Sequence, residues 1–207
     1  MPSKIYPIQL AQSVAQASLV PTRSIVLSGD GAVSLATSII ACSVCERKQV
    51  RFICGDNRFD PYAVARYAKR RGLRPEDALN SILIARAFTA YQLVELVHRL
   101  DAKDASSLVV ISGLCSSFMD EDISFVDAAR LFYRALWRVV ELARSGMTLL
   151  LVQGQMPDTT RRAYFLKDLC STSDIRLRLG GKHTFSLDHH RRIELPRMAA
   201  MPPVIGD

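Results

Sequence analysis

The chain has 207 residues, of which 49% are hydrophobic and 23% are charged, a balance typical of a globular domain with a buried core. No apolar run approaches the roughly 20 residues that a membrane-spanning helix needs, and the first residues lack the apolar stretch of a secretory signal. We therefore expect no membrane partner and a cytoplasmic or nuclear location, or the nucleoid in a prokaryote. The net charge of +7 permits binding to nucleic acid or to an acidic partner.

The first half of the chain alternates between short apolar runs and segments with helical spacing. Apolar runs bounded by glycine or polar turns predict buried strands, and an aspartate followed by proline predicts a helix start. In chain order, we expect a short helix at 9–19, a strand at 24–28, a helix at 34–47, a strand at 50–54, a helix from Asp60 to Gly72, a turn or short helix at 74–79, and a strand at 81–85.

The second half continues the alternation and then changes character after Gln155. Uninterrupted apolar runs are typical of strands that are covered on both faces of a parallel sheet, whereas alternating polar and apolar residues indicate a strand with one wet face. In chain order, we expect a helix capped by Thr89, a strand at 108–111, a long helix at about 122–144, a strand at 147–152, a short helix that ends at Leu166, and an antiparallel hairpin with strands at 174–179 and 184–187.

This order of elements predicts an α/β fold with a mostly parallel sheet. We expect an N-terminal segment over residues 1–23, a single core over residues 24–195 and a flexible tail over residues 196–207.

The turn after the first predicted strand lies where a nucleotide-binding protein has its phosphate loop. Such a loop needs glycine, four residues, glycine, lysine and then serine or threonine, because its amides cradle the phosphates, its lysine neutralises their charge and its hydroxyl holds Mg²⁺. Counted from Gly29, the second glycine, the lysine and the hydroxyl positions hold Ser34, Leu35 and Ala36. Counted from Gly31, a hydroxyl returns but threonine occupies the lysine position. Neither register fits an ATPase.

Beyond this turn, the chain resembles the core of the RecA/RadA recombinase family, of the archaeal and eukaryotic type. The most specific stretches are 55–61 (GDNRFDP) and 80–88 (NSILIARAF), which are similar to the family's T-E-G-T-F-R-P and N-[IV]-x-x-A-R-A-[FY] segments. Residues 24–190 can be laid along the family's pattern. The resemblance implies a RecA-like core, in which helices flank a central sheet.

The resemblance also implies a nucleotide site that has lost its chemistry. The family's water-orienting glutamate aligns with Asp56, its Mg²⁺-supporting acid with Ser112, and its γ-phosphate-sensing glutamine with Gln155. A hydroxyl cannot supply the charge of the Mg²⁺-supporting acid, and phosphoryl transfer relies on positioning and charge stabilisation. The degenerate site comprises Gly29, Gly31, Ser34, Leu35, Ala36, Asp56, Ser112 and Gln155.

We therefore expect degenerate Walker A and Walker B motifs, no ATPase activity and no cofactor. We expect the site to be empty or collapsed, with the apolar side chains of Leu35 and Ala36 available to fill it. Nucleotide binding without hydrolysis is an alternative, because backbone amides and a helix N-terminus attract anions. Rescue of hydrolysis by groups from another chain is a further alternative.

The segment 159–167 matches the family's second DNA-binding loop by position. It mixes basic and aromatic residues, which suits single-stranded nucleic acid, and its candidate contacts are Arg161, Arg162 and Lys167. The alternative is a solvated helix whose aromatic side chains pack inward. We expect no metal site, because the C-x-x-C pair of Cys42 and Cys45 lies inside a predicted helix and no second ligand pair accompanies it.

These features predict a non-catalytic recombinase paralogue that acts as an accessory or mediator in homologous recombination or DNA repair. Its expected partners are single-stranded or double-stranded DNA, a recombinase or another paralogue, with homo- or hetero-oligomers allowed. The alternative is a pseudo-ATPase subunit of a regulatory complex, which contacts proteins and no nucleic acid.

Overall fold

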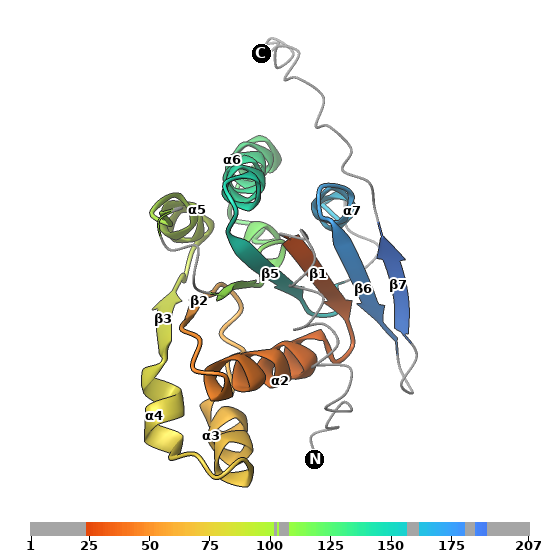
Figure 1. Ribbon diagram of the computed structural model, residues 1–207. Helices are drawn as coiled ribbons and strands as arrows, with labels where there is room; N and C mark the ends of the chain where they lie inside the picture. The colour runs from red at the N-terminus through yellow and green to blue at the C-terminus, as the bar shows by residue number, and fades with distance from the viewer. Residues whose placement is uncertain (1–23, 102, 104–107, 157–161, 181–184, 190–207) are drawn as a thin grey trace, which may run out of the picture.

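The computed structural model describes residues 24–101, 103, 108–156, 162–180 and 185–189. Within them, strands and helices alternate, and six parallel strands form a sheet with helices on both faces (Figure 1). The predicted α/β fold is confirmed at this level. The predicted helix at 9–19 and the tail at 196–207 lie outside the described residues. In the described part of the chain, no helix combines the length and the apolarity needed to cross a bilayer.

The strands lie side by side in the order β3-β2-β4-β5-β1-β6-β7. Each neighbouring pair from β3 to β6 is parallel, so that the first strand in sequence lies between β5 and β6 near the middle of the sheet. The strands are β1 (Ser24–Gly29), β2 (Val50–Cys54), β3 (Ile82–Arg86), β4 (Leu108–Ser112), β5 (Thr148–Gln153), β6 (Ile175–Leu179) and β7 (Phe185–His189).

The strand β7 runs antiparallel along β6. The residues 181–184 that connect the two strands lie outside the described residues, so the predicted C-terminal hairpin stays a prediction. β6 itself alternates buried apolar residues with more exposed arginines, as the sequence pattern indicates.

Two hydrophobic layers cover the sheet. In Figure 1, α2, α3 and α4 lie on one face, and α5, α6 and α7 lie on the other. The helices are α2 (Ala32–Cys45), α3 (Pro61–Arg70), α4 (Pro75–Asn80), α5 (Ala90–His98), the 3-10 helix η2 (Ser116–Phe118), α6 (Phe125–Arg144) and α7 (Tyr164–Ser171).

Side-chain caps fix where several helices begin. The predicted caps Asp60 and Thr89 are confirmed, since each accepts a hydrogen bond from the backbone N–H three residues further on, at 3.0 and 3.2 Å. The long helix, expected from about residue 122, begins instead at Phe125. Ser124 caps it by accepting a hydrogen bond from the N–H of Asp127 at 3.1 Å.

Candidate functional site: a pocket at the carboxyl edge of the sheet

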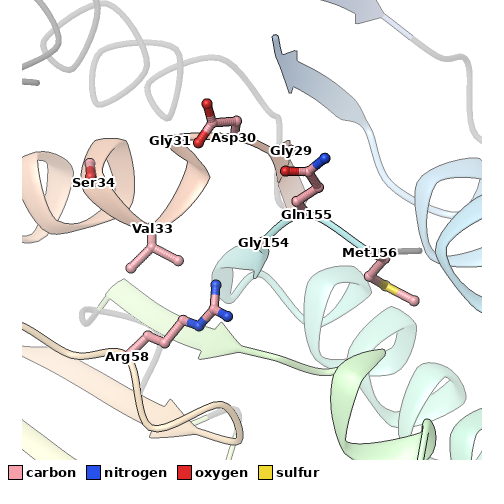
Figure 2. A pocket seen from close by; sticks show the side chains of 9 residues that line it. All are labelled: Gly29, Asp30, Gly31, Val33, Ser34, Arg58, Gly154, Gln155 and Met156. Atoms are coloured by element: carbon pink, nitrogen blue, oxygen red, sulfur yellow. The ribbon is translucent and has the colours of Figure 1, made fainter. Parts of the chain in front are cut away.

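A pocket of about 630 Å³ opens at the carboxyl edge of the sheet, where β1 meets α2 (Figure 2). This edge is the usual place for a ligand in an open α/β sheet, because the loops that follow neighbouring parallel strands meet there. The pocket brings together four of the predicted site residues, Gly29, Gly31, Ser34 and Gln155. Its other lining residues are Asp30, Val33, Arg58, Gly154 and Met156.

The turn between β1 and α2 is much shorter than a phosphate loop. β1 ends at Gly29 and α2 begins at Ala32, so the backbone that would wrap around phosphates already belongs to the helix. Gly29 has φ +93°, and a Cβ atom there would lie 2.2 Å from the carbonyl oxygen of Leu179 on β6. Gly31, with φ 91°, is the N-cap of α2. Both glycines are therefore needed by this tight turn, whatever the pocket binds.

The early start of α2 decides which way the side chains face at the two positions where a phosphate loop has its lysine and its hydroxyl. Leu35 is fully buried and Ala36 nearly so, and both pack in the hydrophobic layer between α2 and the sheet. Neither side chain lines the pocket, since both face the core while Val33 and Ser34 form the pocket wall. A lysine in the position of Leu35 would point away from any ligand in the pocket.

Asp56 and Ser112 contact each other at the same edge of the sheet, and neither lines the pocket. The Ser112 hydroxyl donates a hydrogen bond of 2.8 Å to Oδ2 of Asp56, across the ends of the neighbouring strands β2 and β4. The other carboxylate oxygen, Oδ1, accepts a bond of 3.3 Å from the backbone N–H of Arg58. Gly113 allows this approach, because a Cβ atom there would lie 2.6 Å from the Cβ of Asp56. Both oxygens of the carboxylate are thus held by protein groups.

Arg58 supplies a cation that the sequence analysis missed. Its side chain rises from the loop after β2 and points toward Gly154 (Figure 2), where an added Cβ atom would lie 2.9 Å from Nη1 of the arginine. Its guanidinium forms no ion pair with any carboxylate in the described residues. A single arginine in a loop belongs to no periodic pattern, so no sequence signal marks it.

Gln153 is the second residue that the sequence analysis missed. Its side chain is 1% exposed. Its Oε1 accepts hydrogen bonds from the backbone N–H groups of Cys115 (3.0 Å) and Ser116 (3.4 Å), and its Nε2 donates to the Ser116 hydroxyl (2.7 Å). These bonds tie the end of β5 to the loop after β4. A lone polar residue at the end of an apolar strand was the available signal.

Of the predicted nucleic-acid residues, the structure describes Arg162 and Lys167. The guanidinium of Arg162 donates to the carbonyl oxygens of Phe118 (2.8 Å), Asp120 (2.5 Å) and Ile123 (2.5 Å), so a phosphate would compete with three internal hydrogen bonds. Lys167 is exposed on α7, and Arg161 lies outside the described residues.

The aromatic side chains of the same segment pack inward. Phe165 is fully buried, and its ring stacks on that of Phe132 of α6 with centroids 4.3 Å apart. Tyr164 and Leu166 are partly buried against the same hydrophobic layer. This arrangement agrees with the alternative of a helix whose aromatic residues belong to the core.

The cysteines are free thiols in the described structure. The Cys42 sulfur lies 2.8 Å from the Tyr67 hydroxyl, between α2 and α3. Burial, with a smaller contribution from the nearby Cys42, raises the pKa of the Cys45 thiol. Within the described residues, no group of three or more histidine, cysteine or acidic side chains is placed to hold a metal ion.

Comparison with known proteins assigns no family, since no protein-family model and no curated protein matches the chain.

Proposed function

We propose that the chain is a non-catalytic paralogue of the RecA/RadA recombinases, with a RecA-like core, and that it acts as an accessory or mediator in homologous recombination or DNA repair. The observation that supports this most is the hydrogen bond between Asp56 and Ser112. The resemblance assigns these positions to one catalytic site, and they are in contact although 56 residues separate them in the sequence.

The same contact argues against catalysis. A hydroxyl in the place of the Mg²⁺-supporting acid brings no negative charge, and it occupies one oxygen of the carboxylate that would orient water. None of the described residues that line the pocket is a lysine. Arg58 supports the alternative that the pocket binds an anion such as a nucleotide without hydrolysing it. An arginine does not activate water, so it does not support catalysis.

The proposed partners are DNA and a recombinase or another paralogue. The direct test adds the purified full-length chain to DNA strand exchange by the recombinase of the same host, after affinity capture of the tagged chain with mass spectrometry. We expect the recombinase to co-purify and the yield of strand exchange to change. Neither association nor any effect on strand exchange would rule out the accessory role.

A matched variant separates this proposal from a retained enzymatic role. Asp56→Asn keeps the size of the side chain and the hydrogen bond to Ser112, but it removes the charge. If the chain is non-catalytic, the effect on strand exchange should persist in this variant. If the mechanism depends on ATP, the effect should disappear together with measurable ATP hydrolysis.

Exposed apolar side chains favour the alternative of a protein-interaction subunit without nucleic-acid contact. Leu83 and Ile84 lie on the edge strand β3 and are 55% and 43% exposed, and Phe88, just beyond the strand, is 79% exposed. Apolar side chains on an unpaired sheet edge are typical of protein-docking surfaces. A chain that binds a protein partner but no DNA at low salt would favour this alternative.

A further inference from the structure

We infer that a groove between α2 and α3 binds single-stranded nucleic acid. The groove lies on the helical layer opposite α7, and no described residue of the segment 159–167 lines it. That the ligand is a nucleic acid rests on the proposed DNA-accessory function. That it binds in this groove is argued from the shape and the charge of the groove.

The α3 side of the groove is basic. Residues 58–71 contain five basic side chains and one acidic side chain. Arg66 and Arg70 both line the groove, one helical turn apart. Arg66 lies 3.7 Å from Asp60 in an exposed ion pair, which is a weak interaction. Arg70 and its neighbour Lys69 pair with no carboxylate in the described part of the chain.

An exposed aromatic ring continues the same helix face. Tyr62 is 75% exposed, and Tyr62, Arg66 and Arg70 follow one another at intervals of four residues. Such spacing puts them on one face, over about 12 Å along the helix axis. Proteins that hold single strands combine basic contacts to phosphates with aromatic rings on which bases stack. A merely solvated helix face does not require an exposed ring.

The α2 side of the groove supplies hydroxyl groups. Thr37 and Ser38 donate their hydroxyl hydrogens to backbone carbonyls one turn earlier, at 2.9 and 3.1 Å. Thr37 is buried, whereas the oxygen of the half-buried Ser38 remains as an acceptor for base N–H groups. Ser34 is exposed, and its hydroxyl forms no hydrogen bond with the described residues. Ser34 lines both the groove and the pocket that contains Arg58, so the two hollows adjoin.

The test measures binding of the full-length chain to a fluorescein-labelled oligo-dT strand by anisotropy, over a series of salt concentrations. Arg66→Ala with Arg70→Ala should weaken binding at least tenfold at low salt. It should also reduce the slope of log K against log [salt] by about 1.4, because two phosphate contacts are lost. Tyr62→Leu should weaken binding about tenfold and leave the slope unchanged, because stacking releases no counterions.

The matched control is Arg134→Ala with Arg144→Ala, which removes the same charge from exposed positions on α6, on the other face of the sheet. Thermal unfolding of every variant confirms that it is folded. The inference is wrong if the α3 variant behaves like this control, or if the unmodified chain shows no salt-dependent binding. If only Arg161→Ala with Arg162→Ala abolishes binding, the inference about the groove is wrong, but the proposed accessory role is not contradicted.

A failure of the accessory role gives a different pattern. The chain would then bind the oligonucleotide through Arg66 and Arg70, yet neither associate with a recombinase nor change strand exchange.

Discussion

Gln153 and Gln155 lie two positions apart at the end of β5, yet they face different surroundings. Gln155, which aligns with the family's phosphate-sensing residue, is an exposed residue on the pocket wall. Gln153 is buried, and its amide holds the backbone of Cys115 and Ser116. At the scale of single residues, the end of β5 is thus held to the loop after β4 by the glutamine that the resemblance does not mark.

This difference predicts that the same substitution lowers the free energy of unfolding by different amounts at the two positions. Gln153→Leu leaves the N–H groups of Cys115 and Ser116 without their acceptor while it roughly keeps the volume. It should lower the free energy of unfolding by about 1–3 kcal/mol. Gln155→Leu should change it by no more than about 0.5 kcal/mol. Urea denaturation followed by circular dichroism measures both, and equal costs would show that the buried hydrogen bonds contribute little.

Asp56 and Ser112, which the resemblance aligns with residues of one site, are in contact, but no aligned motif predicts the direction of Leu35. The direction of a helical side chain depends instead on where the helix begins. Here that point follows from the left-handed glycines and from the close approach of Gly29 to Leu179. Such a long-range contact leaves no mark in the local sequence.

At the scale of elements, the edge strand β3 has one buried apolar side chain, that of Ile82, followed by two exposed ones, those of Leu83 and Ile84. Ile82 packs in the layer with α2 and α4, whereas Leu83 is mostly exposed. β3 is bonded to β2 alone among the described strands, so its outer edge has no strand partner in the described part of the chain. Unpaired edges with apolar side chains promote association between molecules.

Lysine substitutions along β3 should separate stability from association. Leu83→Lys should leave the free energy of unfolding within about 0.5 kcal/mol of its original value, because the side chain is exposed, and it should reduce self-association. Ile82→Lys, the control on the same strand, should lower the free energy of unfolding by about 2–5 kcal/mol because it buries a charge. Thermal unfolding and light scattering at increasing concentration provide the measurements. Unchanged scattering in Leu83→Lys would contradict a role of this edge in association.

Elements were easier to predict than their arrangement. The strands β1 to β5 were located within about a residue because each is a short apolar run ended by a turn, as in 50–54 and 108–111. Asp60 and Thr89 marked two helix starts because a cap is a local interaction. The position of β1 between β5 and β6 involves residues more than a hundred positions apart, and apolar runs do not specify which strand lies beside which.

At the scale of the whole molecule, the residues that the resemblance aligns with the family's catalytic positions are distributed over several strand ends. The glycine turn follows β1, Asp56 follows β2, Ser112 ends β4 and Gln155 follows β5. No single substitution would therefore supply all the residue types of the family's site. A lysine at the aligned position would be the hardest to place in the pocket, because the two-residue turn starts α2 early and directs Leu35 into the core.

The double variant Leu35→Lys with Ser112→Asp tests this conclusion. It supplies both missing residue types, yet we expect no phosphate release from ATP above background, because the new lysine is buried beneath α2 and cannot reach a ligand in the pocket. We also expect unfolding at a much lower temperature, since a charge enters the core and a second carboxylate lies beside Asp56. Ser34→Lys, on the pocket wall, is the control that should keep the original stability within about 0.5 kcal/mol. ATP hydrolysis by the double variant would mean that the turn can open into a phosphate loop, and that the geometry of α2 does not prevent catalysis.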